Sequence, residues 1–89
     1  MSIILDDCAR DEIITRNGKQ VVIDTRYVPY PLGHGYETQV FAQFTNQIGH
    51  MVTDYGKGVL DEKRYGESKT AAETGHTKMV NKWIKEILV

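Results

Sequence analysis

The amino-acid sequence predicts an α+β fold in which an antiparallel sheet of three to four strands, opened by a β-hairpin, is covered by one C-terminal α-helix. Three observations predict it: two apolar runs around an Asn-Gly turn, an alternating segment after a proline-rich loop, and an apolar stripe of helical period near the end. The 89 residues suit one domain, with an N-terminal segment (1–10), a β-meander (11–60) and a helix (68–88).

The first two strands are predicted as a β-hairpin. Two apolar runs, 13–14 and 21–23, flank Asn17-Gly18, a dipeptide typical of type I′ turns. With two loop residues, Ile14 faces Val21 across the strands. The other face is also apolar near the turn, which indicates a second layer or a protein contact. The register assigns to one face Ile14, Val21, Ile23, Thr25 and Tyr27.

A third strand follows the hairpin. Two prolines end the second strand, because proline has no N–H for the sheet, and residues 29–35 form a loop. Residues 36–44 then alternate as a strand does. A fourth strand over 50–55 is indicated more weakly, with a turn or loop at 54–58. The two faces of the third strand are Tyr36, Thr38, Val40 and Ala42 on one side, and Glu37, Gln39, Phe41 and Gln43 on the other.

The last element is predicted as a helix that covers the sheet. Ser68 is a favourable N-cap, and Trp83 is expected in the middle of the apolar stripe. Gly75 costs about 1 kcal/mol relative to alanine inside a helix, so its presence indicates a close approach of the backbone to a neighbour. The stripe consists of Ala72, His76, Met79, Val80, Trp83, Ile84, Ile87 and Leu88.

Four residues in the predicted helix or just before it are predicted to have structural roles. His76 lies on the apolar stripe, so we expect a core histidine that bonds to a strand carbonyl or to Tyr36 or Thr38. Tyr65 comes just before the cap and is expected to pack on the first turn. The predicted structural residues are Tyr65, Gly75, His76 and Trp83.

Composition argues against several classes of function. Eleven basic and twelve acidic side chains leave a net charge of -1, whereas proteins that bind duplex nucleic acid carry strongly basic surfaces. The single cysteine, Cys8, has no partner for an intramolecular disulfide. No apolar stretch reaches the roughly 18 residues that span a bilayer. We therefore expect a cytoplasmic protein without a membrane contact.

Two glycine-flanked turns are candidates for contact with an anion. In Gly33-His34-Gly35 and Gly56-Lys57-Gly58, backbone amides can approach a phosphate closely. Nearby aromatic side chains can stack on a base while cations hold its phosphate. Ordinary turn chemistry, core packing or an interface would explain the same residues without a ligand. The candidate ligand-binding residues are Arg26, Tyr30, His34, Tyr36 and Lys57.

Neither a metal site nor a catalytic site is predicted. The histidines His34, His50 and His76 lack the spacing of metal ligands, and the chain has no second cysteine to support a thiolate site. Glu37 and Glu73 are not placed to work with a nucleophile. We expect no cofactor, no metal and no enzymatic activity.

Two motifs carry a resemblance: a strand Tyr36-Glu37-Thr38-x-Val40-Phe41, and a helix Ala72-x-x-Gly75-His76-x-x-Met79-Val80. With the aromatic Tyr65 before the helix, the sequence resembles a family of small tailed-phage proteins over most of residues 21–83. That family has no settled activity. The resemblance therefore implies a phage accessory protein without naming its chemistry.

The resemblance implies a protein that acts by binding, as small phage accessory proteins commonly do. We expect a counter-defence role in the host cytoplasm, through non-catalytic sequestration of a nucleotide immune signal or through blocking a host defence protein. A phage structural or assembly component is the alternative. The small core and the hairpin that is apolar on both faces also predict a homo-oligomer.

Overall fold

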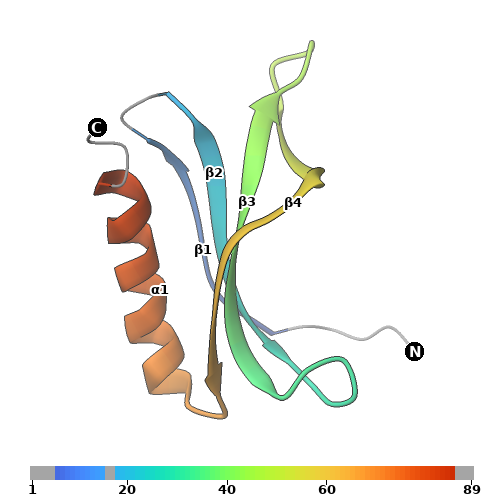
Figure 1. The fold of residues 1–89 in the computed structure, drawn as a ribbon. Coiled ribbons are helices and arrows are strands. Elements are labelled where there is room, and N and C mark those ends of the chain that lie inside the picture. The colour runs from blue at the N-terminus through green and yellow to red at the C-terminus, as the bar shows by residue number, and fades with distance from the viewer. Residues whose placement is uncertain (1–5, 16–17, 86–89) are drawn as a thin grey trace.

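The computed structural model describes residues 6–15 and 18–85, which form a four-stranded antiparallel sheet with one helix against it (Figure 1). The strands are neighbours in chain order, β1-β2-β3-β4, so the sheet is a meander. The predicted α+β class is confirmed. The elements are β1 (Asp6–Ile14), β2 (Gln20–Val28), β3 (Gly35–Thr45), β4 (Met51–Gly66) and α1 (Lys69–Lys85).

The sheet is longer than the predicted meander at both ends. β1 begins at Asp6, inside the predicted N-terminal segment 1–10, and β4 continues to Gly66 instead of ending near residue 60. The acidic start of β1 has low intrinsic strand propensity, so local sequence does not predict a strand there. Its pairing with the far end of β2, where Asp6 lies opposite Tyr27, overrides that propensity.

The β1–β2 hairpin has a different register from the predicted one. Thr15 donates its backbone N–H to the carbonyl of Lys19 at 2.8 Å, and Ile14 lies opposite Gln20 instead of Val21. Asn17 of the predicted turn lies outside the described residues, and Gly18 has a φ of 79°. The shift by one residue places Ile13 opposite Val21 and turns Ile14 to the uncovered face, where it is 64% exposed.

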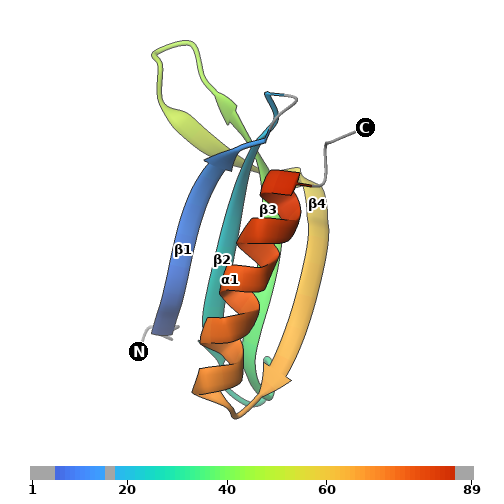
Figure 2. The same cartoon turned by 90° about the vertical axis from the view of Figure 1, so that its left-hand side faces the viewer.

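α1 covers one face of the sheet (Figure 2). The core on that face is small: Val21, Ile23 and Val40 pack against Met79 of the helix, with Ile13, Val80 and Trp83 around them. The predicted alternation of β3 is confirmed, because Thr38 and Val40 are fully buried.

The helix begins as predicted. The Ser68 hydroxyl accepts the backbone N–H of Ala71 at 3.1 Å, which caps the first turn. Trp83 lies near the end of α1 and is half-buried, not in the middle of the stripe, and Ile84 is exposed. The predicted stripe residues Ile87 and Leu88 lie outside the described residues.

The opposite face of the sheet is polar and charged at its centre. Asp24 is only 3% exposed there, and it forms ion pairs with Arg26 on the same strand and with Arg10 on β1, the latter at 3.4 Å. Two guanidinium groups compensate the buried carboxylate. This face therefore does not contain a second apolar core at its centre.

The β3–β4 pairing is interrupted in the region where the sequence signal was weak. Ala42 pairs with Asp54, but the preceding residue on β3, Phe41, pairs with Val59. Residues 55–58 of β4 therefore lie outside the ladder. Tyr55 packs edge-on against Phe41 with the ring centroids 5.0 Å apart. No helix in the described part of the chain has the length and apolarity needed to cross a membrane.

Candidate functional site

A continuous chain of hydrogen bonds runs under the helix and includes a residue from every element. The carboxylate of Asp11 (β1) lies 2.7 Å from Nε2 of His76 (α1), whose Nδ1 lies 2.6 Å from the hydroxyl of Thr25 (β2). That hydroxyl is 2.5 Å from the hydroxyl of Thr38 (β3), which accepts the hydroxyl of Tyr65 (β4) at 2.9 Å. His76 is therefore a core histidine, but its partners are Thr25 and Asp11 instead of the predicted ones.

One direction of this chain gives every donor an acceptor. Tyr65 donates to Thr38, Thr38 to Thr25, and Thr25 to Nδ1 of His76, so each hydroxyl donates once. His76 completes the chain by donating from Nε2 to Asp11. A neutral ring with its proton on Nδ1 would instead turn the Nε2 lone pair toward an acceptor oxygen of Asp11. We therefore assign the Nε2–H tautomer to His76.

The order carboxylate, imidazole, hydroxyl also occurs in hydrolytic triads, so accessibility decides what this group can do. Thr25 has no exposed surface, and its hydroxyl is already engaged by Thr38 as well as by His76. A substrate cannot reach the hydroxyl while α1 stays in place. The arrangement acts as a polar connection between helix and sheet.

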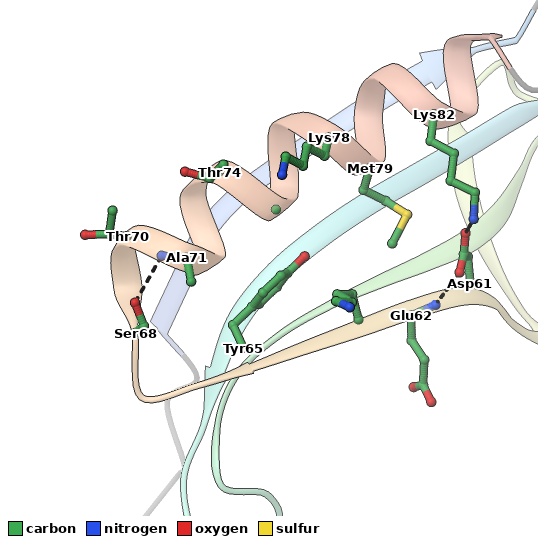
Figure 3. A pocket seen from close by; sticks show the side chains of 12 residues that line it. Asp61, Glu62, Tyr65, Ser68, Thr70, Ala71, Thr74, Lys78, Met79 and Lys82 are labelled. Atoms are coloured by element: carbon green, nitrogen blue, oxygen red, sulfur yellow. Dashed lines mark hydrogen bonds and ion pairs between the residues drawn. The ribbon is translucent and has the colours of Figure 1, made fainter.

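A groove beside this chain runs between α1 and the second half of β4. It has a volume of about 700 Å³. Figure 3 shows Tyr65 rising from β4 toward the helix within it. The ring lies directly under Gly75, where a Cβ atom would be only 2.2 Å from Cε1 of Tyr65. The groove is lined by Asp61, Glu62, Lys63, Tyr65, Ser68, Thr70, Ala71, Thr74, Gly75, Lys78, Met79 and Lys82.

At one end of the groove lies the carboxylate of Asp61, which is paired with a lysine. Asp61 accepts hydrogen bonds from Lys82 at 2.6 Å and from the indole of Trp83 at 3.2 Å. Burial acts to raise the pKa of Asp61, but Lys82, Trp83 and the backbone N–H of Glu62 together outweigh burial and lower the pKa below its usual value. Asp61 therefore stays ionised and cancels the charge of Lys82.

The remaining charge of the groove is positive. Lys63 and Lys78 form no ion pair with a carboxylate of the described residues. Glu62 belongs to the lining, but its side chain points away from the helix (Figure 3). Two ammonium groups therefore line the groove together with the apolar surfaces of Tyr65 and Met79.

The predicted ligand-binding residues do not form one site. Arg26 is on the face away from the helix, in the ion pair with Asp24. Lys57 lies in the interruption of the β3–β4 ladder, next to the pairing of Phe41 with Val59. That point is about 20 Å along β3 from the loop before Gly35, at ~3.3 Å per residue.

Three of the predicted residues lie together at the β2–β3 loop. Tyr30 and His34 pack with ring centroids 5.5 Å apart, and His34 and Tyr36 line a hollow of about 430 Å³. Its charged groups, Glu37 and Arg64, face each other at 3.9 Å. This smaller hollow therefore offers less uncompensated charge to an anion than the groove does.

Tyr36 also contacts Tyr27, with ring centroids 5.0 Å apart in an edge-on arrangement. Tyr27 donates its hydroxyl to the carboxylate of Glu67 at 3.0 Å. The pKa of Tyr27 is raised above its ordinary value, mainly by this hydrogen bond and to a smaller extent by burial. Tyr36 thus takes part in a ring pair between β2 and β3.

Sequence analysis missed the α1–β4 groove although a signal was present. Two small residues and a methionine recur every four positions beside a stripe of hydroxyl and ammonium groups, which is the pattern of a helix that borders a cleft. The inner stripe is Ala71, Gly75 and Met79, and the outer stripe is Thr70, Thr74, Lys78 and Lys82. The contribution of β4 had no comparable signal, because its pairing with β3 is irregular.

Among the described residues, no group of three or more His, Cys, Asp or Glu side chains is arranged to hold a metal ion.

Comparison of the chain with family models, curated proteins and solved structures finds no match. The ligand class that suits the groove therefore follows from the residues that line it.

Proposed function

We propose that this protein binds a small nucleotide in the α1–β4 groove without transforming it. The observation that carries the proposal is the placement of Lys63 and Lys78, which pair with no carboxylate of the described residues, in one groove with the apolar surfaces of Tyr65 and Met79. A nucleotide combines the two matching features, an anionic phosphate and a flat aromatic base.

The size and composition of the groove support this ligand class. Sites for small molecules and cofactors commonly enclose about 300 to 1,000 Å³, with a mostly apolar lining and a few polar groups. The groove, at about 700 Å³, lies within that range. Thr70 and Thr74 add hydroxyl groups along the outer stripe of the helix, where they can bond to sugar or phosphate oxygens.

The chemistry of the lining favours binding over catalysis. The described residues around the groove include no histidine or cysteine, and the Ser68 hydroxyl is the cap of the helix. Of the two lining carboxylates, Asp61 is paired with Lys82 and Trp83, and Glu62 points away from the helix (Figure 3). His76 is committed on both ring nitrogens beneath the helix. A reaction would need a base within hydrogen-bond reach of the nucleophile or substrate.

The resemblance to small tailed-phage proteins supplies the proposed biological setting. We place the protein in the host cytoplasm as a phage accessory protein that sequesters a nucleotide immune signal and so counters a defence system. A protein that blocks a host defence protein directly, or a structural or assembly component of the phage, would leave the groove empty of nucleotide.

Calorimetry against cyclic dinucleotides and cyclic ADP-ribose isomers tests the proposal. The Lys63→Gln/Lys78→Gln variant should bind the recognised nucleotide at least tenfold more weakly, because each charge-assisted hydrogen bond contributes about 1.5 to 3 kcal/mol. Lys57→Gln is the matched control, since Lys57 is an exposed lysine outside the groove, and its affinity should not change.

Recovery of the nucleotide after heat denaturation distinguishes sequestration from catalysis. Mass spectrometry should find the ligand intact. An altered nucleotide would mean that the protein is an enzyme. Absence of binding across the panel, or equal weakening by Lys57→Gln, would remove the groove as a nucleotide site and favour direct protein inhibition or a virion role.

A further inference from the structure

We infer that the β3–β4 arm, defined as residues 44–60, is the surface through which two copies of this chain associate. The arm contains the end of β3, the turn after it and the first part of β4. It extends beyond the β1–β2 hairpin and bends to the side away from α1 (Figures 1 and 2). The inference is independent of the proposed function, because the groove uses the later part of β4.

Exposed apolar side chains are concentrated in the arm. Of the eleven large hydrophobic side chains that are exposed among the described residues, seven lie within residues 44–60. Scattered exposed hydrophobic residues are normal on a protein surface, but a cluster of this kind is typical of an interaction site. The seven are Phe44 (46% exposed), Ile48 (75%), Met51 (41%), Val52 (37%), Tyr55 (65%), Val59 (42%) and Leu60 (41%).

The arm also lacks the charges that keep an exposed strand pair separate. Its 17 residues contain one acidic side chain, Asp54, and one basic side chain, Lys57, and therefore no net charge. Edge strands that avoid association usually carry several charged residues or proline. The first part of β4 is at the edge of the sheet and has neither a proline nor a run of charges.

The turn of the arm is well ordered, so association does not have to fix a flexible loop. Asn46 accepts hydrogen bonds on its side-chain oxygen from the backbone N–H groups of Ile48 (3.1 Å) and His50 (2.9 Å). The backbone of Asn46 also donates to the carbonyl of His50 at 2.8 Å. A preformed surface loses less conformational entropy when it binds.

The small core of the chain identifies the partner as a second copy. The described chain has seven buried hydrophobic residues, and four of them are valines. A domain with so little buried apolar surface is marginal alone and gains stability from a partner that is present whenever the chain is made. Another copy of the chain meets that condition. Two identical edge strands related by a twofold axis also pair antiparallel without further requirements.

The exposed area is sufficient for a dimer. At the ~150 to 250 Å² of a large side chain, the exposed fractions of the seven residues amount to on the order of 600 Å². A stable interface buries about 800 Å² per partner, and backbone and polar groups of the arm supply the remainder.

Sedimentation equilibrium of the full chain between about 1 and 200 µM tests the inference by mass action. Wild-type protein should have the mass of two chains at the upper end. Ile48→Lys/Val52→Lys should shift the dissociation constant upward by at least 100-fold. The matched control is Leu32→Lys/Ile84→Lys, which adds the same charge at two aliphatic residues of similar exposure, 65% and 42%, outside the arm. The control should associate like wild type.

Hydrogen exchange of the wild-type protein provides a second measurement that does not depend on the variants folding. Backbone amides of residues 44–60 should become more protected as the protein concentration rises. A monomer throughout the concentration range would overturn the inference. So would equal dissociation by the control variant, or concentration-dependent protection that falls on α1 or β1 instead of the arm.

Discussion

Substitution of Gly75 by alanine is expected to destabilise the protein, although the same change stabilises most helices. Alanine normally gains about 1 kcal/mol over glycine inside a helix. Here the new methyl group would lie 2.2 Å from Cε1 of Tyr65 and 2.4 Å from its hydroxyl oxygen. The tyrosine cannot move away easily, because its hydroxyl is bonded to Thr38 at 2.9 Å.

The expected size of the effect comes from three contributions. Overpacking costs about 1 to 3 kcal/mol, and loss of the hydrogen bond between Tyr65 and Thr38 costs about 0.5 to 1.5 kcal/mol. The gain in helix propensity offsets about 1 kcal/mol of this. The free energy of unfolding should therefore fall by about 0.5 to 3.5 kcal/mol. With a slope near 1 kcal/mol/M, the urea midpoint should fall by about 0.5 to 3.5 M.

Urea titration followed by tryptophan fluorescence and circular dichroism measures this change. Thr74→Ala, at an exposed position next to Gly75, is the matched control and should alter stability by less than about 0.5 kcal/mol. In a Tyr65→Ala background, Gly75→Ala should become stabilising by about 1 kcal/mol, because only helix propensity remains. A higher midpoint for Gly75→Ala in the wild-type background would refute the close packing of Tyr65 under the helix.

Three further predictions concern the polar connections of the helix. Nitrogen NMR should find the His76 proton on Nε2, and a proton on Nδ1 would contradict the assigned direction of the chain. His76→Ala should lower the free energy of unfolding by about 2 to 4 kcal/mol in urea titration, because it opens a cavity and leaves the Thr25 hydroxyl proton without its acceptor. Trp83→Ala should cost about 1 to 3 kcal/mol, less than the roughly 3 to 5 kcal/mol of a fully buried aromatic residue, since Trp83 is half-buried. Because the pKa of Asp61 is lowered in the folded state, the ionised carboxylate should stabilise the protein above about pH 4, and this stabilisation should disappear as the pH falls further. The difference in free energy of unfolding between wild type and Asp61→Asn should therefore shrink in acid, by less than about 1 kcal/mol because the pair is partly exposed. A difference that does not change with pH would contradict the pairing with Lys82.

The groove and the arm are separate surfaces, and this separation has a functional consequence. The groove uses residues 61–82, whereas the arm uses residues 44–60. A dimer formed through the arms would therefore leave both grooves open. Under the two proposals, the assembly would hold two nucleotides in independent sites, and arm variants should bind nucleotide with unchanged affinity per chain.

The sequence by itself determined the features that depend on local periodicity. The alternation of β3 placed Thr38 and Val40 on the face toward the helix, and the cap at Ser68 marked where the helix begins. Gly75 indicated a close approach in α1, and the neighbouring Tyr65 supplies it. In each case the information lies within a few residues, since side-chain direction follows the period of the strand or helix.

The hairpin register could not be predicted from local periodicity. Asn17-Gly18 suits a two-residue turn, but the structure pairs Ile14 with Gln20, one residue away from the predicted partner. A shift of one residue exchanges the faces of Ile13 and Ile14, because side chains alternate with a period of two. The observed register is the one that packs Ile13 against the core.

Only the tertiary structure decided the polar chain and the groove. Asp11 and His76 are 65 residues apart, and Tyr65 meets Thr38 from a strand whose pairing is irregular. The sequence contained each donor and acceptor, but a hydrogen bond requires two atoms within about 3 Å, and no local pattern records that distance. The fold class therefore followed from periodicity within segments, whereas the site followed from the way in which the packing of α1 on the sheet brings distant segments together.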